Sequence, residues 1–222
     1  MCGRFTLIAP GEAIADLFQL PAAPELAPRY NIAPTQPVAA VRVSPQTGER
    51  ELTHLVWGLI PSWADDPSIG SRMINARSET AAEKPSFRAA FKYRRCLLPA
   101  DGFYEWQKQN GAKQPMRVQM KDGRPFAMAG LWERWQSPDG SEIESCTILT
   151  TEPNDLLEEV HNRMPVILHP ADFALWLDPG AQHPGEVQDL LRPYPAAEMR
   201  FYPVSTQVNS PHNDTPEVIQ PL

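Results

Sequence analysis

The residue with the most distinctive chemistry is Cys2, which follows the initiator methionine and precedes Gly3. Removal of Met1 leaves a thiol and an α-amine together on one residue, with reference pKa values of about 8.5 and about 7.7–8.0. The amine can condense with an aldehyde, and the thiol can then close a five-membered thiazolidine. Alternatively, the thiol attacks an acyl group with the amine as its base. The alternative, for Cys2 taken alone, is an ordinary second residue that is buried or chemically inert.

Three further polar residues stand in apolar surroundings. In the segment 74–79, Asn75 and Arg77 point to the same face if the chain is extended. The guanidinium could then engage a phosphate while the amide orients a sugar or a nucleophile. Glu105 lies between Tyr104 and Trp106, and apolar rings should raise its pKa toward neutrality, which suits a proton shuttle. An exposed loop and a surface glutamate are the alternative interpretations of these two segments.

His161 follows a segment, 155–160, for which the residue pattern predicts a short helix. At the negative end of a helix dipole the imidazole would stay protonated more readily, as a general acid near an anionic substrate. A structural helix cap is the alternative.

Two turn-like segments contain candidate contact residues. Pro34 stands in the turn-like segment 29–36, whose tip could wedge against a base. Trp63 is the last residue of the segment 57–63, directly after its turn. An exposed indole stacks on an unpaired base with about 1–3 kcal/mol. Packing in the core is the alternative for either side chain.

The charge of the chain is divided between two regions. The net charge is −7, but the segment 70–95 has seven basic residues and two acidic ones, whereas residues 138–222 have fourteen acidic residues and three arginines. A basic face can bind phosphates whatever the total charge. A solvated helix face is the alternative for such a run.

Composition limits the remaining classes. Cys2, Cys96 and Cys146 have no paired Cys or His spacing, which argues against a zinc site or a disulfide framework. Cys96 and Cys146 stand in apolar runs and are expected in the core. No apolar run approaches the roughly 20 residues that span a bilayer, and no signal peptide is recognisable. We therefore expect a cytoplasmic protein without membrane contact, metal ion or cofactor.

Short β-type segments outnumber helical ones, and 25 prolines separate them. The pattern predicts strands at 38–44, 52–60, 95–100, 116–121, 126–132, 146–151, 164–168 and 200–204. It predicts helices at 11–20, 85–93, 155–160, 171–177 and 186–191. No βαβ alternation or glycine-rich phosphate loop occurs. We therefore expect an α+β fold, a single domain over 1–222, with a mainly antiparallel, barrel-like β core and peripheral short helices.

Together, the ordered motifs MCGRF, RYNIAPTQ, WGLIPSW, INARSET, DGFYEW and HNRMPVIL resemble the SRAP family of SOS-response-associated peptidases, which are abasic-site sensors. The resemblance extends over essentially the whole chain, to VSTQVN and EVIQPL. It implies an SRAP-like fold and covalent capture of abasic sites in single-stranded DNA. Cys2, exposed by autocatalytic removal of Met1, would form a reversible thiazolidine crosslink that shields the site from strand cleavage.

By the same resemblance, Asn75 helps to hold the reactive centre, Glu105 is the acid/base carboxyl, and His161 assists Schiff-base and ring-opening chemistry. The resemblance also implies DNA contacts for five residues: Arg4, Pro34, Trp63, Arg77 and Arg163. We expect a monomer whose partners are single-stranded DNA and replication-fork proteins. The rival functions are an N-terminal-nucleophile cysteine amidohydrolase, a plain peptidase and a non-enzymatic single-strand-binding module.

Overall fold

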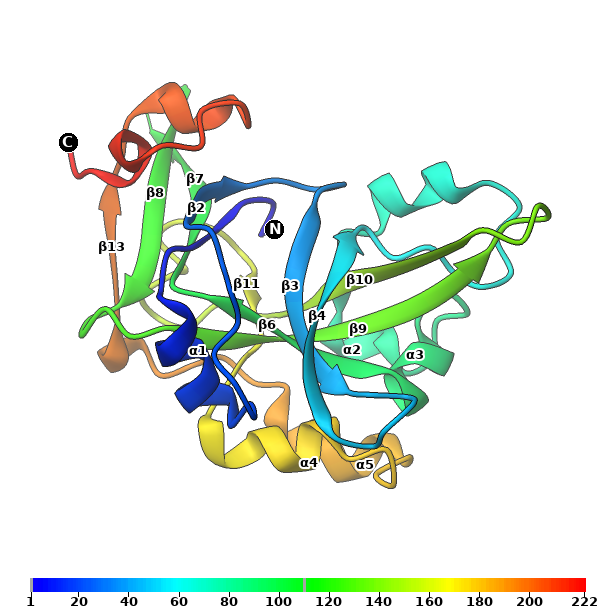
Figure 1. Cartoon of the computed structure of the whole chain (residues 1–222). Coiled ribbons are helices and arrows are strands. Elements are labelled where there is room, and N and C mark those ends of the chain that lie inside the picture. Colours follow the sequence, from blue (N-terminus) through cyan, green and yellow to red (C-terminus); the bar gives the residue numbers. More distant parts are fainter. Residues whose placement is uncertain (1, 110) are drawn as a thin grey trace.

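The computed structural model describes residues 2–109 and 111–222, and a five-stranded barrel lies at its centre (Figure 1). Antiparallel pairing runs in the order β4–β3–β6–β9–β10, and a parallel pairing of β10 with β4 closes the ring. The strands are β3 (Pro37–Val43), β4 (Arg50–Trp57), β6 (Arg95–Ala100), β9 (Phe126–Gln136) and β10 (Glu142–Thr151). Their buried apolar side chains, including Leu55, Trp57, Leu97 and Ile148, belong to the main core.

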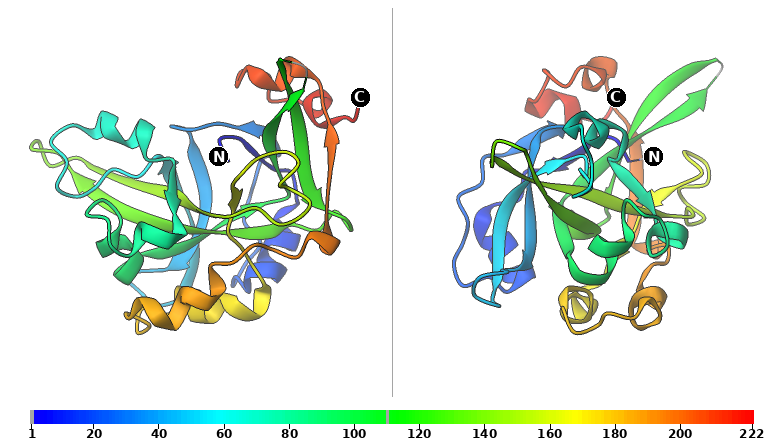
Figure 2. Two further views of the ribbon diagram at one scale, coloured as in Figure 1. Left: turned by 180° about the vertical axis from the view of Figure 1, so that it is seen from behind. Right: turned by 90° about the vertical axis from the view of Figure 1, so that its right-hand side faces the viewer.

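A second sheet packs beside the barrel and is antiparallel throughout. Its order is β13 (Met199–Pro203), β8 (Ala112–Met120), β7 (Gly102–Gln109), β1 (Phe5–Leu7) and β2 (Arg29–Ile32). Figure 2 shows β8 and β13 rising beside the barrel, with the C-terminal turns above them. A single residue, Asp101, separates β6 from β7, so the chain passes there from one sheet to the other.

The end of β10 carries two short strands that matter for the site. β5 (Asn75–Arg77) pairs with it in parallel, with Asn75 opposite Ile148 and Arg77 opposite Thr150. β11 (Met164–Pro165) pairs with it in antiparallel fashion, with Met164 opposite Thr151. Because both strands meet β10 at the same end, the segments around Asn75 and His161 are brought together.

Short helices surround these sheets. They are α1 (Gly11–Phe18), α2 (Ser78–Ala81), α3 (Arg88–Tyr93), α4 (Phe173–Leu177) and α5 (Pro184–Val187), with 3₁₀ turns at Pro67–Arg72, Pro170–Asp172, Gln188–Leu190, Ala196–Glu198, Thr206–Asn209 and Pro216–Ile219. α1 forms within the predicted helix 11–20 and buries Ile14 and Phe18. No helix among the described residues is long and apolar enough to cross a bilayer.

The predicted α+β fold with a mainly antiparallel, barrel-like core is confirmed, and a strand forms at each of the eight predicted positions. The run predicted at 164–168 is divided, because β11 pairs with β10 while β12 (Ile167–Leu168) pairs with β9. The strand predicted at 52–60 ends at Trp57, since Gly58 takes a φ of 136°. Four strands were not predicted: β1, β2, β5 and β7.

The helix predicted at 155–160 is wrong, because this segment forms successive turns. Asn154 directs it: its side-chain Oδ1 accepts from Leu157 N–H at 3.0 Å, and its Nδ2 donates to the Tyr194 carbonyl at 2.7 Å. The first of these bonds is a helix N-cap, but the backbone bonds that follow mix i→i−3 with i→i−4 pairs, at Leu157 and Val160 and at Glu158 and His161, so no regular helix is formed.

Candidate active site

Cys2 lies at the centre of the candidate site and is fully buried. Asn75 Nδ2 donates a hydrogen bond of 2.8 Å to the Cys2 carbonyl oxygen, which fixes the backbone of the reactive residue. Asn75 Oδ1 is also buried and accepts no hydrogen bond from the residues that the structure describes. The amide therefore holds the Cys2 peptide and leaves a polar oxygen beside it. Met1 lies outside the described residues, so its predicted removal has no structural counterpart here.

Glu105 reaches the same centre from β7, where it pairs with Met116 of β8. The residue is only 3% exposed, and this burial raises the pKa of its carboxyl to about 7. The sequence predicts this direction of shift from the aromatic neighbours. A carboxyl with such a pKa is populated in both forms near neutral pH, as a group that accepts and returns a proton requires.

His161 faces Glu105, with 4.0 Å between its Nε2 and Oε2 of the carboxyl. His161 Nδ1 has two contacts with the backbone of Arg163: the N–H at 3.1 Å, which it accepts when the ring proton is on Nε2, and the carbonyl oxygen at 3.3 Å, to which it donates when the proton is on Nδ1. The expectation of a readily protonated His161 is wrong, because burial lowers the pKa of the imidazole and turns replace the helix before it. In the tautomer with its proton on Nε2, the neutral ring presents a hydrogen-bond donor on the side of Glu105.

The thiol of Cys2 is electrostatically coupled to this pair. Burial raises its pKa, and the negative charge of Glu105 raises it further. The resting thiol therefore keeps its proton, and its sulfur needs a nearby base before it can act as a nucleophile. The thiol faces the Arg4 carbonyl oxygen at 4.0 Å, and Glu105 is the carboxylate whose charge acts on it.

Two of the five predicted DNA contacts are already engaged within the protein. Arg4 Nη1 donates to Asn31 Oδ1 and to the Val208 carbonyl, each at 2.8 Å, and burial lowers its pKa. Arg163 binds Glu79 with both Nη atoms, at 2.5 and 2.8 Å, and also donates to the Thr150 carbonyl at 2.6 Å. Both arginines hold segments around the site in place.

The other three predicted contact residues are more open. Arg77 is exposed on β5, two residues beyond Asn75, and the extended strand supports their predicted common face. Pro34 is half-buried in the turn between β2 and β3. Trp63 is 57% exposed, and its Nε1 lies 3.5 Å from the Pro85 carbonyl, to which it donates.

Sequence reasoning missed a buried ion pair that supports β1 and β7. Asp101 accepts from Thr6 Oγ1 at 2.6 Å and from Ala9 N–H at 2.8 Å, and it pairs with Arg117 at 3.4 Å. A Cβ at Gly102 would come within 2.8 Å of the Arg117 guanidinium, so a larger residue there would push that side chain from its place beside Asp101. The Asp-Gly pair at the start of DGFYEW is the local signal for this arrangement.

Glu79 was also missed as a functional residue, although the sequence places it in the motif INARSET. It lies in the first turn of α2, which follows β5 directly, and both of its carboxylate oxygens reach Arg163 there. Hydrogen bonding to Arg163 lowers the pKa of this carboxyl, which keeps it ionised. No group of three or more His, Cys, Asp and Glu side chains within 2–109 and 111–222 is arranged to hold a metal ion.

Comparison with known proteins agrees with this architecture. The family model described as SOS response associated peptidase (SRAP) matches residues 1–211. The abasic site processing protein YoqW of Bacillus subtilis is 47% identical over 225 residues, which cover 99% of each chain. The abasic site processing protein HMCES of Gallus gallus is 37% identical over 226 residues, covering 88% of this chain and 66% of its own.

Solved structures show the same fold. A crystal structure of a Bacteroides thetaiotaomicron protein matches with a TM-score of 0.82 and 27% identity over the full length of both chains. A Bordetella bronchiseptica protein matches with a TM-score of 0.78 and 30% identity, covering 92% of this chain and 100% of its own. The chain belongs to the SRAP family.

Proposed function

We propose that this protein captures abasic sites in single-stranded DNA covalently, through Cys2 after autocatalytic removal of Met1. The observation that carries the proposal is the convergence of Cys2, the Asn75 amide and the Glu105–His161 pair. The names of the relatives support the abasic site as the substrate. A crosslink of this kind shields the site from strand cleavage.

The proposed chemistry begins with the closed sugar of the abasic site. Glu105, protonated in part at neutral pH, gives a proton to O4′ as the ring opens, and the resulting carboxylate takes the proton of the C1′ hydroxyl as the aldehyde forms. The free α-amine of Cys2 then adds to C1′, and loss of one water gives the Schiff base. Glu105 next gives its proton to the imine nitrogen and takes the proton of the thiol, while the sulfur adds to C1′ and closes the thiazolidine.

The surrounding residues suit these steps. Asn75 holds the Cys2 carbonyl, which keeps the amine and thiol in one orientation. In the tautomer with its proton on Nε2, neutral His161 stabilises the Glu105 carboxylate whenever Glu105 has lost its proton. The same proton transfers in reverse reopen the ring, so the crosslink is reversible on this mechanism.

Ring closure explains why the thiol is needed in addition to the amine. An imine at C1′ acidifies the protons on C2′ and thereby promotes β-elimination and strand scission. The thiazolidine contains no imine and removes that route. A variant that has the amine without the thiol should therefore nick the strand instead of protecting it, which is a limited lyase activity.

The test uses a single-stranded oligonucleotide with one abasic site and denaturing gels of the wild type and Cys2→Ala. A heat-resistant shifted band with the wild type alone is expected, together with an intact mass that lacks Met1. No band with the wild type, or an equal band with Cys2→Ala, would refute the proposal. Release of ammonia from glutamine without a band would instead identify an N-terminal-nucleophile amidohydrolase.

A further inference from the structure

A stripe of three basic side chains follows α3 and the turn before it. Lys84, Arg88 and Lys92 stand four residues apart, and Arg88 N–H donates to the Lys84 carbonyl at 2.8 Å, so all three follow one helical path. Residues at this spacing share one side of a helix. None of the three makes an ion pair within the part of the chain that the structure describes. We call these residues the α3 stripe.

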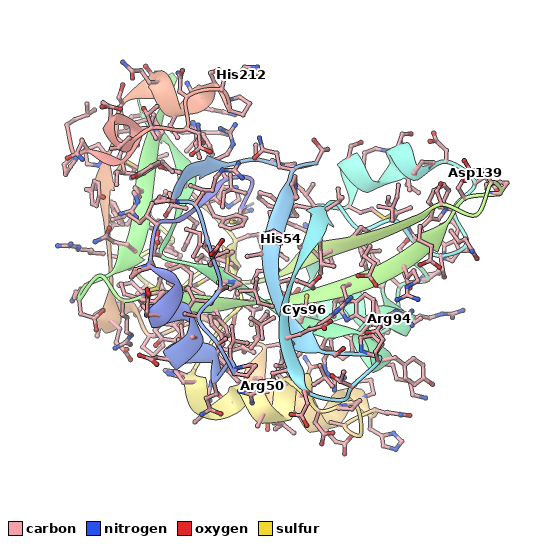
Figure 3. All side chains as sticks on the ribbon, viewed as in Figure 1. Arg50, His54, Arg94, Cys96, Asp139 and His212 are labelled. Carbon is pink, nitrogen blue, oxygen red and sulfur yellow. The ribbon has the colours of Figure 1, made fainter. Side chains whose placement is uncertain are left out.

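An exposed aromatic ring stands at the end of the α3 stripe, between two hollows. Tyr93 is 50% exposed, and the Lys92 ammonium lies 4.9 Å from its ring centre. On one side is a cavity of about 550 Å³, lined by Tyr93, Arg94, Trp132, Leu177 and others. A second cavity, of about 350 Å³, also borders Tyr93 and is lined by Arg88, Lys92, Pro184 and others. Figure 3 marks Arg94 on this side of the molecule, far from His212 in the C-terminal turns.

The α3 stripe is connected to the candidate active site by continuous chain. β5 carries Asn75 and Arg77, α2 follows at once, and the turn after α2 leads into α3. Trp63 contacts the carbonyl of Pro85, next to the first lysine of the stripe. Exposed aromatic rings therefore stand at both ends of the α3 stripe, with Trp63 near Lys84 and Tyr93 beside Lys92.

We propose that the α3 stripe binds the single-stranded flank of a nucleic acid. Phosphates lie against Lys84, Arg88 and Lys92, and a base stacks on Tyr93 and enters a neighbouring hollow. Lysine and arginine side chains that bind phosphates release counterions from the nucleic acid, and this release favours binding. Unpaired bases stack on exposed aromatic rings that lie beside such side chains. An acidic peptide would use the cations but has no bases to stack on the two rings. This proposal rests on the proposed function at one point only, because the proposed function identifies the bound strand as single-stranded DNA.

The test measures equilibrium binding without crosslinking, with Cys2→Ala protein and fluorescent oligonucleotides that lack an abasic site. The stripe variant combines Lys84→Gln, Arg88→Gln and Lys92→Gln. The control variant removes three exposed lysines elsewhere, by Lys108→Gln, Lys113→Gln and Lys121→Gln, and so changes the net charge equally. Oligonucleotides of roughly 7 and roughly 20 nucleotides bracket the site sizes typical of single-strand-binding proteins.

The stripe variant should bind the longer strand at least about tenfold more weakly, and the slope of log K against log salt should fall by about 2, since each lost phosphate contact on a single strand contributes about 0.7. The shorter strand and the control variant should change little. Tyr93→Ala should weaken binding of the longer strand at least about fivefold without a change of slope.

Placement of the extra nucleotides sharpens the test. Cys2→Ala protein with and without the stripe substitutions is compared on strands that contain one tetrahydrofuran analogue of an abasic site and are extended only on its 5′ side or only on its 3′ side, and one of the two strands should show the dependence on the stripe. Equal losses for stripe and control variants, equal losses on short and long strands, or a dependence only on a duplex flank would each overturn the proposal. Crosslinking of a short abasic strand by the wild type is scored separately, so its failure would refute the proposed function alone.

Discussion

Replacing Glu105 by glutamine should make the protein more stable at neutral and alkaline pH. Burial raises the pKa of this carboxyl from an ordinary value of 4.5 to about 7. The folded protein therefore binds this proton more tightly than the unfolded chain does. Its contribution to stability is greatest below pH 4.5, falls as the pH rises, and is fully lost above about pH 7. Glutamine resembles the neutral carboxyl at every pH and avoids this loss.

The size of the effect follows from the shift. A difference of one pKa unit corresponds to 1.36 kcal/mol, so the penalty above pH 7 is about 3 kcal/mol. For a chain of this size each kcal/mol changes Tm by about 2–4 °C, which predicts a Tm for Glu105→Gln about 6–12 °C above that of the wild type at pH 8. At pH 5 the difference should be much smaller. Crosslinking should be lost in the same variant.

The assay is thermal and urea unfolding of both proteins from pH 5 to pH 8. Glu133→Gln is the matched control, since Glu133 is also buried but its Oε2 accepts from Arg94 at 2.6 Å. That variant should be less stable at pH 8, by about 1.5–3 kcal/mol for a hydrogen bond to a charged group. A Glu105→Gln protein that gains no stability between pH 5 and pH 8, or loses it as the control does, would refute the argument from burial.

Two other predictions concern the residues that support the site. Glu79→Gln should release the Arg163 side chain and disturb the two backbone contacts of Arg163 with His161 Nδ1, which ¹⁵N NMR of the imidazole should show as a changed ratio of the two tautomers; an unchanged ratio would count against this positioning role. Asp101→Asn should cost about 3–5 kcal/mol, because Arg117 stays buried without its carboxylate. Urea unfolding measures that loss, and a change below 1 kcal/mol would contradict it.

Local sequence patterns were sufficient for the barrel strands and for β8 and β13 of the second sheet, but they missed β1, β2 and β7. The runs around Val41, Leu97 and Ile148 are rich in β-branched and aliphatic residues, and they form β3, β6 and β10. β7 was missed because only Asp101 separates it from β6, and no local pattern shows that the chain changes sheets there. The partners that fix this change, Thr6 and Arg117, lie 95 and 16 residues away in sequence.

The residue types of the candidate site could be inferred from the sequence, but their electrostatic states could not. The predicted direction of the Glu105 pKa is correct, but Tyr104 and Trp106 alternate with Glu105 along β7 and pack in a separate cluster, so the shift comes from burial in the fold and not from those two rings. The state of His161 depends on burial and on a turn directed by Asn154, and both come from distant packing. Likewise, nothing near Arg163 in the sequence shows that Glu79 binds it.

The assembly of this site has a consequence for protein synthesis. Cys2 leaves the ribosome first, yet Asn75 is 73 residues away, and Glu105 and His161 follow later still. Contacts between such distant residues form late, after most of the chain is available to fold. A nascent chain therefore presents its amino terminus before Asn75, Glu105 and His161 are in place. On the proposed function, in which Met1 is removed autocatalytically, the α-amine of Cys2 stays blocked until the site has folded.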